Sequence, residues 1–334
     1  MFVNHIKIPS VYLDSIICSR GYKIARYTLE GKPIESLGSL PDSKYALLAR
    51  CPLTRRFFRA EITGLYELKD GSRIAIAKKG IFLQKPKGSF EKVFTTPRGS
   101  KPLNLCILPN GHIFFGEYFQ NMERKAVNIY ASYDNGCSWQ VAYTFAEGNI
   151  NHIHKVTYDP FTGRIWVLTG DRENECIIGY TEDEFKSFKE LFRGGQEYRS
   201  CHLFFYEKFI VFATDSQYMQ NEIRCFDRDT LEIKSLAKIQ GSAIKGGQSG
   251  NVSFLATTIE PSEVNKDRYS HLWYTKDGLN WVDAVWYKKD CLPAIFQFGT
   301  IEFPNYECPI TDKLWYSGRA LKGLDGKTAY IEIG

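Results

Sequence analysis

The stretch Tyr130–Trp139, with the sequence YASYDNGCSW, decides the fold of this chain. An apolar, β-rich segment, VNIYAS, enters a tight turn at Asp134, Asn135 and Gly136, and a second apolar segment, WQVAYTF, follows it. In such a turn the Asp carboxylate accepts hydrogen bonds from backbone N–H groups, Gly adopts a positive φ, and Trp139 is a large apolar side chain that packs in the core. The stretch therefore predicts a β-hairpin with a hydrogen-bonded turn.

Turns of the same kind recur along the chain. Residues 275–281 (TKDGLNW) keep the Asp, Gly and Trp positions, and residues 181–188 (TEDEFKSF) keep the hydroxyl, Asp, Ser and aromatic positions. More degraded copies lie at 83–90 (LQKPKGSF) and 226–230 (FDRDT). The turns begin about 45 to 50 residues apart, which is the length expected of a four-stranded propeller blade.

The intervals between these turns read as further apolar strands joined by Gly, Pro, Asn and Asp. Two examples are LNLCILPNGHIFFGEYF at 103–119 and HIHKVTYDPFTGRIWVLTGD at 152–171. Five units begin near residues 59, 102, 152, 200 and 243, and the two ends of the chain hold strands for two more. Helical periodicity is not convincing anywhere, so no helix is expected.

The repeats predict an all-β fold, a β-propeller of four-stranded antiparallel blades that forms a single domain over residues 1–334. Seven blades are favoured and six are the alternative. The first strand, FVNHIKIP, is expected to close the last blade, because a closed ring leaves no exposed sheet edge.

The pattern Ser132-x-Asp134-x-Gly136-x-Ser138-Trp139 resembles the Asp box, or BNR repeat, of sialidase-type β-propellers. The resemblance implies a propeller whose box turns are structural and whose site lies at the axis, away from the boxes. A true sialidase would add an Arg-Ile-Pro motif near the N-terminus, and residues 32–34 read Lys-Pro-Ile instead. Typical sialidase activity is therefore not expected.

Composition narrows the class of protein. The chain has 334 residues with 15% aromatic residues, which favours strands, and a formal net charge of only +5 without a dense basic run, so nucleic-acid binding is not expected. Nine cysteines, odd in number and without CxxC spacing, predict reduced thiols that act as small apolar residues. No signal peptide or membrane span is visible, and a cytoplasmic protein is expected.

Blade topology sorts the polar residues into two faces. The start of each inner strand and the end of each second strand lie on one face, opposite the box turns. The predicted catalytic residues on that face are Glu117, Tyr118, His152, His154, Asp171 and Asp215. The predicted substrate-binding residues are Arg59, Glu61, Asn104, Arg199, His202 and Arg319. Charges next to otherwise apolar strands need partners, and this mixture suits an anionic or polyhydroxylated ligand.

Each of these residues also has a structural interpretation. His152 and His154 alternate on one strand and fit a metal pair, an acid/base pair or two structural histidines; no metal is assigned to them. Asp171 and Asp215, at matching positions of successive units, fit acid and nucleophile or loop caps. Arg199 fits a carboxylate clamp or a surface ion pair. Residues 171–175 (DRENE) fit a Ca²⁺ site or, more ordinarily, a solvated acidic loop, and no other cofactor is expected.

Three functions follow. The first is a glycoside hydrolase acting on a glycan, with two carboxylates among Glu117, Asp171 and Asp215 as acid and nucleophile or base. The second is a lyase on uronate-containing glycans, in which His152, His154 or Tyr118 abstracts a proton. The third is a propeller that binds glycans or assembles partners without catalysis. The hydrolase is the leading prediction, and a glycan is the expected partner in all three.

Overall fold

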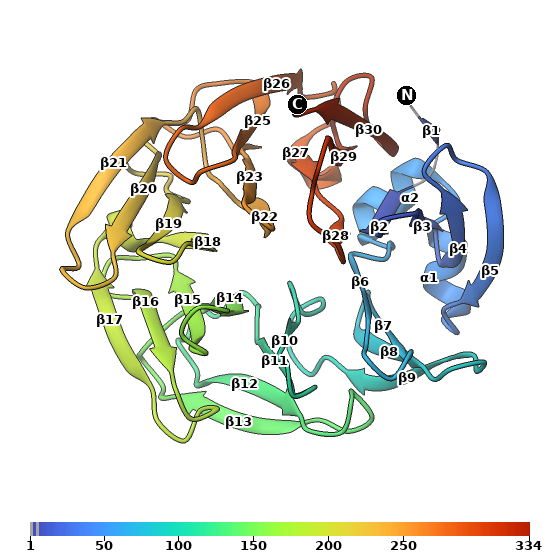
Figure 1. Ribbon diagram of the computed structural model, residues 1–334, viewed down its shortest axis with the longest axis horizontal. Coiled ribbons are helices and arrows are strands. Elements are labelled where there is room, and N and C mark those ends of the chain that lie inside the picture. Colours follow the sequence, from blue (N-terminus) through green and yellow to red (C-terminus); the bar gives the residue numbers. More distant parts are fainter. Residues whose placement is uncertain (1–2, 5–6) are drawn as a thin grey trace.

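The chain is a closed ring of seven β-sheets around a central axis (Figure 1). The computed structural model describes residues 3–4 and 7–334. Each sheet is a blade whose first strand lies nearest the axis and whose fourth strand lies at the rim, so the prediction of seven blades is confirmed. We number the blades in chain order from the one that begins at β2 (Lys7–Val11).

The blades have the following strands. Blade 1 holds β2, β3 (Ser15–Arg20), β4 (Lys23–Thr28) and β5 (Pro33–Ser39), and blade 2 holds β6 (Gly64–Glu67), β7 (Arg73–Ala77), β8 (Gly80–Gln84) and β9 (Phe90–Thr95). Blade 3 holds β10 (Cys106–Ile107), β11 (Ile113–Gly116), β12 (Val127–Ser132) and β13 (Gln140–Phe145). Blade 4 holds β14 (His152–Tyr158), β15 (Ile165–Gly170), β16 (Cys176–Thr181) and β17 (Lys189–Gly194). Blade 5 holds β18 (Ser200–Phe205), β19 (Phe209–Thr214), β20 (Glu222–Asp227) and β21 (Ile233–Lys238). Blade 6 holds β22 (Lys245–Ser249), β23 (Val252–Ala256), β25 (Tyr269–Thr275) and β26 (Val282–Lys288). Blade 7 holds β27 (Gly299–Glu302), β29 (Lys313–Arg319), β30 (Lys327–Glu332) and β1 (Val3–Asn4).

The two ends of the chain close the ring together. In blade 7 the strand β1 pairs antiparallel with β30, with Val3 opposite Thr328, so segments from the two ends of the chain share one sheet (Figure 1). A second link is β28 (Asn305–Tyr306), which follows β27 and pairs parallel with β2 of blade 1. The expected closure of the last blade by FVNHIKIP is confirmed for Val3–Asn4 only, because Lys7, Ile8 and Pro9 belong to β2, the inner strand of blade 1.

The hydrophobic core is divided among the joints between neighbouring blades. Seven clusters of buried side chains each combine residues of two adjacent blades. Between blades 3 and 4, for example, Phe114 packs with Ile153 and Val156. Between blades 7 and 1, Trp315 packs with Ile8 and Ile16. Because every face of every blade is covered, the strands read as nearly continuous apolar runs in the sequence.

The box turns lie between the third and fourth strands, on the face opposite the predicted site. In the first turn Asp134 Oδ1 accepts from Ser132 Oγ at 2.8 Å and from Ser138 N at 2.9 Å. Asp183 accepts the equivalent bonds from Thr181 and Ser187, at 2.8 and 2.9 Å, although Glu184 and Phe185 replace the flexible glycine there with positive φ values of 54° and 73°. The shared geometry explains the repeat as a device for closing hairpins.

Two short helices correct the expectation that the chain has none. They are α1 (Ser43–Leu48) and α2 (Pro52–Phe58), and they connect blades 1 and 2. The first begins at Asp42, whose carboxylate accepts from Tyr45 N at 3.2 Å, and Pro52 begins the second. Helices of one to two turns are too short to produce a visible 3.6-residue period, so a periodicity test misses them.

Two further predictions from composition can be compared with the structure. All nine cysteines are free, and Cys18, Cys106, Cys176, Cys201 and Cys225 are buried, as small apolar residues would be. Over the described residues, no helix is long and apolar enough to span a membrane.

Candidate functional site

The predicted face does gather a compact polar cluster, built from the ends of second strands and the starts of inner strands. Asp171 directly follows β15, and Asp215 directly follows β19. Tyr118 is the second residue after β11. His152 and His154 begin β14, and Arg199 immediately precedes β18. Antiparallel pairing places these strand ends together, for example His152 opposite Gly170 in the β14–β15 register.

The two histidines turn the same ring nitrogen toward each other and toward Asp171. The Nε2 atoms of His152 and His154 are 3.1 Å apart, and each lies 3.4 Å from an oxygen of the Asp171 carboxylate. The Nδ1 atom of His152 lies 3.1 Å from the Phe119 carbonyl, and that of His154 lies 3.0 Å from the Ser200 carbonyl. Because a carbonyl oxygen only accepts, both Nδ1 atoms carry the proton that they donate.

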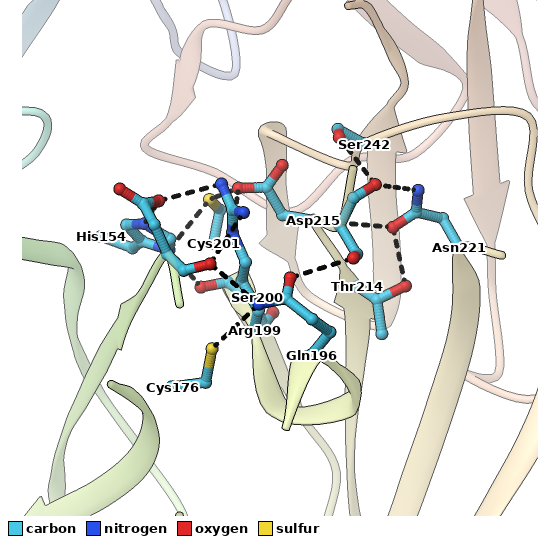
Figure 2. Close-up of polar contacts among 12 residues, drawn as sticks. His154, Cys176, Gln196, Arg199, Ser200, Cys201, Thr214, Asp215, Asn221 and Ser242 are labelled. Atoms are coloured by element: carbon cyan, nitrogen blue, oxygen red, sulfur yellow. Dashed lines mark hydrogen bonds and ion pairs between the residues drawn. The ribbon is translucent and has the colours of Figure 1, made fainter. Parts of the chain in front are cut away.

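Arg199 joins this group to a second carboxylate. Its Nη2 atom lies 2.9 Å from Asp171 Oδ1, and its Nε atom lies 3.6 Å from Asp215 Oδ2. Cys201 donates its thiol to Asp215 at 3.4 Å and lies 3.6 Å from His154 Nδ1 (Figure 2). The guanidinium thus bridges blades 4 and 5 at the mouth of the ring.

The loops that carry the carboxylates are fixed by further hydrogen bonds. Gln196 Nε2 donates to the Asp171 carbonyl at 2.8 Å, and its Oε1 accepts from Ser216 Oγ at 3.0 Å. Asn221 Oδ1 accepts from Ser216 N at 2.7 Å and from Thr214 Oγ1 at 3.0 Å (Figure 2). Such a shell holds charged side chains in one geometry.

Two groups with altered pKa values line the open side of the cluster. Tyr118 is 37% exposed, and its ring lies 4.2 Å from that of His152 at an interplanar angle of 53°. Burial together with the charges of Cys201 and Asp171 raises the pKa of its phenol. Burial and the charge of Asp215 raise the pKa of Glu260. Burial alone would raise the pKa of Asp171, but its contacts with His152 and His154 lower it well below the usual range.

Glu260 was not among the predicted residues. It follows β24 (Thr258–Ile259), which pairs with β27 of blade 7, and it lies four residues after the end of β23, the second strand of blade 6. The strand-end rule missed it, because Asp171 and Asp215 directly follow their second strands, whereas Glu260 lies beyond the extra short strand β24. Glu260 has no ion-pair partner among the residues that the structure describes.

Lysines converge on the axis beside this cluster. Burial, followed by the charge of Arg319, lowers the pKa of Lys101 to about 7, and burial with the charge of Lys245 lowers that of Lys155 to about 8. Within residues 3–4 and 7–334, the side-chain ammonium groups of Lys101, Lys155 and Lys245 have no hydrogen bond and no ion pair. Cys201 influences the pKa values of Tyr118, Lys155 and Lys245, so the cationic axis adjoins the cluster.

Arg319 and Glu61 lie together but outside the His–Asp cluster. Arg319 pairs with Glu61 and with Glu302 at 2.5 Å each, and Lys7 pairs with Glu302 at 2.9 Å. Arg59 is an exposed residue that ends α2 in the left-handed conformation with φ 54°. These three predicted binding residues surround a different part of the mouth from His154 and Arg199.

Glu117, Asn104 and His202 also lie apart from the cluster. Glu117 is 3% exposed, forms a short double contact with Arg98, and accepts from Asn128 N at 2.9 Å. Asn104 and His202 line a cavity of about 1130 Å³ that reaches Asn135 on the box face. Residues 171–175 do not form the Ca²⁺ site considered from the sequence. Glu175 pairs with Arg124 at 2.5 Å, whereas Asp171 faces the histidines, so their carboxylates do not point at a common position.

A seven-bladed β-propeller with a His, Asp, Arg and Tyr cluster at one mouth is the class that the fold and the site define. No protein-family model matches the sequence, and no curated protein matches it. Virginiamycin B lyase from Staphylococcus aureus is similar in structure, with a TM-score of 0.60, 14% identity, and coverage of 100% of this chain and 99% of that chain.

Two other solved structures are also similar, to different extents. An oligogalacturonate lyase in complex with manganese has a TM-score of 0.64 at 7% identity, over 99% of this chain and 90% of that chain. The GH74 enzyme of Niastella koreensis has a TM-score of 0.52 at 13% identity, over 86% of this chain and 45% of that chain. At such identities the likeness establishes the propeller fold and leaves the activity open.

Proposed function

We propose that this propeller cleaves an anionic, uronate-containing glycan by β-elimination at the mouth formed by Tyr118, Asp171, Asp215 and Glu260. The observation that carries the proposal is the combination of one unpaired carboxylate and one phenol beside unpaired lysines. Glu260 is the carboxylate, Tyr118 is the phenol, and Lys101 and Lys245 are buried ammonium groups at the axis without an ion pair among the described residues.

The same contacts weaken the hydrolase interpretation that the sequence favours. A glycosidase needs two carboxyl groups that face the substrate, one of them protonated. Glu117 is buried against Arg98, and Asp215 is 4% exposed beneath Arg199. Asp171 is engaged by Asn151, Arg199 and both histidines, with Asn151 Nδ2 donating at 2.5 Å. Among the candidate carboxylates at the mouth, only Glu260 has no ion pair within the part of the chain that the structure describes, and its side chain is hydrogen-bonded with Gln217.

Elimination needs one base and one acid, and these two residues supply them. The Glu260 carboxylate takes the proton from the carbon next to the uronate carboxylate, and the electron pair left behind forms the new carbon–carbon double bond. The bond from the neighbouring carbon to the glycosidic oxygen breaks, and that oxygen takes the phenol proton of Tyr118. The raised pKa values of the two groups suit these roles, because a stronger base accepts the proton and a neutral phenol keeps one to give.

The lysines supply the third requirement, which is neutralisation of the substrate carboxylate. The negative charge that develops on the carboxylate side of the scissile centre is stabilised by cations in a desolvated site. A bound anion would also favour the charged forms of Lys101 and Lys245, because burial and repulsion from Arg319 and Lys7 lower the pKa values of both lysines. Two proteins of similar fold, virginiamycin B lyase and oligogalacturonate lyase, are lyases by name, which is compatible with this chemistry.

A panel of uronate oligosaccharides and their carboxyl-reduced counterparts tests the proposal. Elimination gives a product whose double bond, conjugated with the carboxylate, absorbs in the ultraviolet, and only the acidic substrates give it. New reducing ends without this absorbance, from both sets of substrates, would instead establish hydrolysis. Glu260 as acid and the ionised Asp171 as base would then be the pair to test, because their environments move the two pKa values apart.

A further inference from the structure

The arrangement of His152, His154 and Asp171 has the features of a metal site. A bond length of about 2.0–2.1 Å from metal to imidazole nitrogen places neighbouring ligand atoms roughly 3.0–3.4 Å apart. The separations here are 3.1 Å between the two Nε2 atoms and 3.4 Å from each Nε2 to the Asp171 carboxylate. The three residues therefore already hold the spacing of a coordination sphere.

The tautomers of the two histidines support the same conclusion. Each Nδ1 donates to a backbone carbonyl, Phe119 for His152 and Ser200 for His154, which directs the remaining lone pair of each ring to Nε2. Metal-binding histidines are typically held in this way by their second nitrogen. Two lone pairs 3.1 Å apart repel each other unless a cation or a shared proton lies between them.

The structure also builds an outer shell around the carboxylate. Asn151 Nδ2 donates to Asp171 Oδ2 at 2.5 Å, and Arg199 Nη2 lies 2.9 Å from Oδ1. Gly170, next to Asp171, permits the close approach, because a Cβ there would lie 2.6 Å from Cε1 of His154. The neighbouring group of His154, Cys201 and Asp215 is a poorer candidate, because the Nδ1 atom that faces Cys201 is the one that donates to Ser200.

We propose that Nε2 of His152, Nε2 of His154 and the carboxylate of Asp171 bind one divalent first-row transition-metal ion. Two imidazoles and one carboxylate leave coordination positions open toward the mouth, where Tyr118 lies. The site deepens the proposed function by naming a cation that would face the acidic sugar, yet it rests on geometry that does not require that function.

Metal titration of the whole protein, without any substrate, tests the site. After removal of metals with a chelator, Zn²⁺ binding is followed by calorimetry, and Co²⁺ is followed by the visible bands of a cobalt–imidazole complex. We expect one ion per chain. His152→Ala and His154→Ala should each weaken binding by more than about 100-fold, and Asn151→Ala, in the outer shell, by roughly 10-fold.

His271→Ala is the matched control. His271 lies in β25 of blade 6 with Nδ1 2.8 Å from Asp283 and Nε2 3.3 Å from Asp267, so it is a histidine with carboxylate neighbours but without a second imidazole. Its replacement should leave the stoichiometry and affinity unchanged. His154→Gln replaces His154→Ala if the latter does not fold cooperatively.

Two results would overturn the proposal. One is a wild-type protein that binds no Zn²⁺ or Co²⁺ at a one-to-one ratio, which would leave a shared proton between the two Nε2 atoms. The other is binding that His152→Ala and His154→Ala do not weaken. Because substrate is absent, either result leaves β-elimination to be judged by its own assay.

Discussion

Replacement of Asp171 by Asn, compared with the same change at Asp159, separates a functional carboxylate from a structural one. Both belong to blade 4 and both pair with an arginine, Asp171 with Arg199 and Asp159 with Arg228. The Asp171 side chain is 30% exposed, whereas that of Asp159 is fully buried. The two variants therefore remove one charge each from opposite ends of the same blade.

The two stability losses follow from these environments. Asp159 accepts from Arg228 at 2.6 and 3.1 Å and caps its own turn through Thr162 at 2.7 Å, so Asp159→Asn strands a buried cation and costs about 3–5 kcal/mol. In Asp171→Asn, Arg199 keeps Asp215 as a partner at 3.6 Å. Because solvent also screens the partly exposed Asp171 site, the loss in the free energy of unfolding is about 1–2 kcal/mol.

Activity should show the reverse order. Asp171→Asn removes the anion that holds Arg199 and both histidines, and we expect turnover of a uronate glycan to fall by at least about 100-fold. Asp159→Asn should retain the wild-type rate at a temperature where it is folded. Urea unfolding measures the free energies, and ultraviolet absorbance measures the rates. Wild-type turnover by Asp171→Asn, or an Asp171→Asn loss of stability as large as that of Asp159→Asn, would refute the assignment.

Three further changes have defined outcomes. Glu260→Gln should lower kcat by about 10²–10⁴-fold, as expected for loss of a general base. The stability of the fold should stay the same or rise, because burial in the folded state disfavours the charged carboxylate. An unchanged kcat would exclude Glu260 as the base. Lys245→Met should raise KM for acidic glycans and raise stability, since burial and repulsion from Arg319 and Lys7 now lower its pKa, and a stability loss without a change in KM would assign it a structural role. The box carboxylates Asp183 and Asp277 have folded-state pKa values lowered to about 2, through hydrogen bonds with Ser187 and, against the effect of burial, with Asn280. The stability that they contribute is therefore present above the unfolded value of about 4 and is lost as the pH falls toward 2, and Asp277→Asn should flatten this part of an acid-unfolding curve; an unchanged slope would contradict the assignment.

The propeller was predictable because its repeat is local. Asp134, Asp183 and Asp277 each close a hairpin through bonds within a few residues, so the sequence records the turn directly. The helices α1 and α2 were not predictable, because Arg56 of α2 is held by the distant Asp290 and by the Phe296 carbonyl at 2.7 Å. Tertiary contacts stabilise such short helices, and a sequence period does not reveal them.

The site was predictable in its face and only partly in its membership. Blade topology correctly brings His152, His154, Asp171, Arg199 and Asp215 together, since antiparallel strands return to the same edge. The direction of each side chain depends on irregular strand starts. The register shifts between Ile153 and Lys155 in β14, and between Ser200 and Leu203 in β18. A bulge changes the direction in which neighbouring side chains point. His202 therefore lines the cavity that reaches the box face, whereas its neighbour Cys201 contacts Asp215.

The partners of buried charges also lie beyond what a sequence pattern shows. Glu117 directly follows the second strand of its blade, as Asp171 and Asp215 do, but it is paired with Arg98 from the connection between blades 2 and 3. Glu260 has no such partner among the described residues and is half-buried at the mouth. Whether a carboxylate at the mouth is paired therefore depends on residues from other loops, which the local sequence pattern does not show.

The most direct measurement is the mass of the products formed from a uronate oligosaccharide in water labelled with heavy oxygen. Elimination through Glu260 and Tyr118 predicts that no label enters either fragment and that one fragment carries a double bond. Label in the new reducing end, or products of either kind formed at the wild-type rate by Glu260→Gln, would contradict the account.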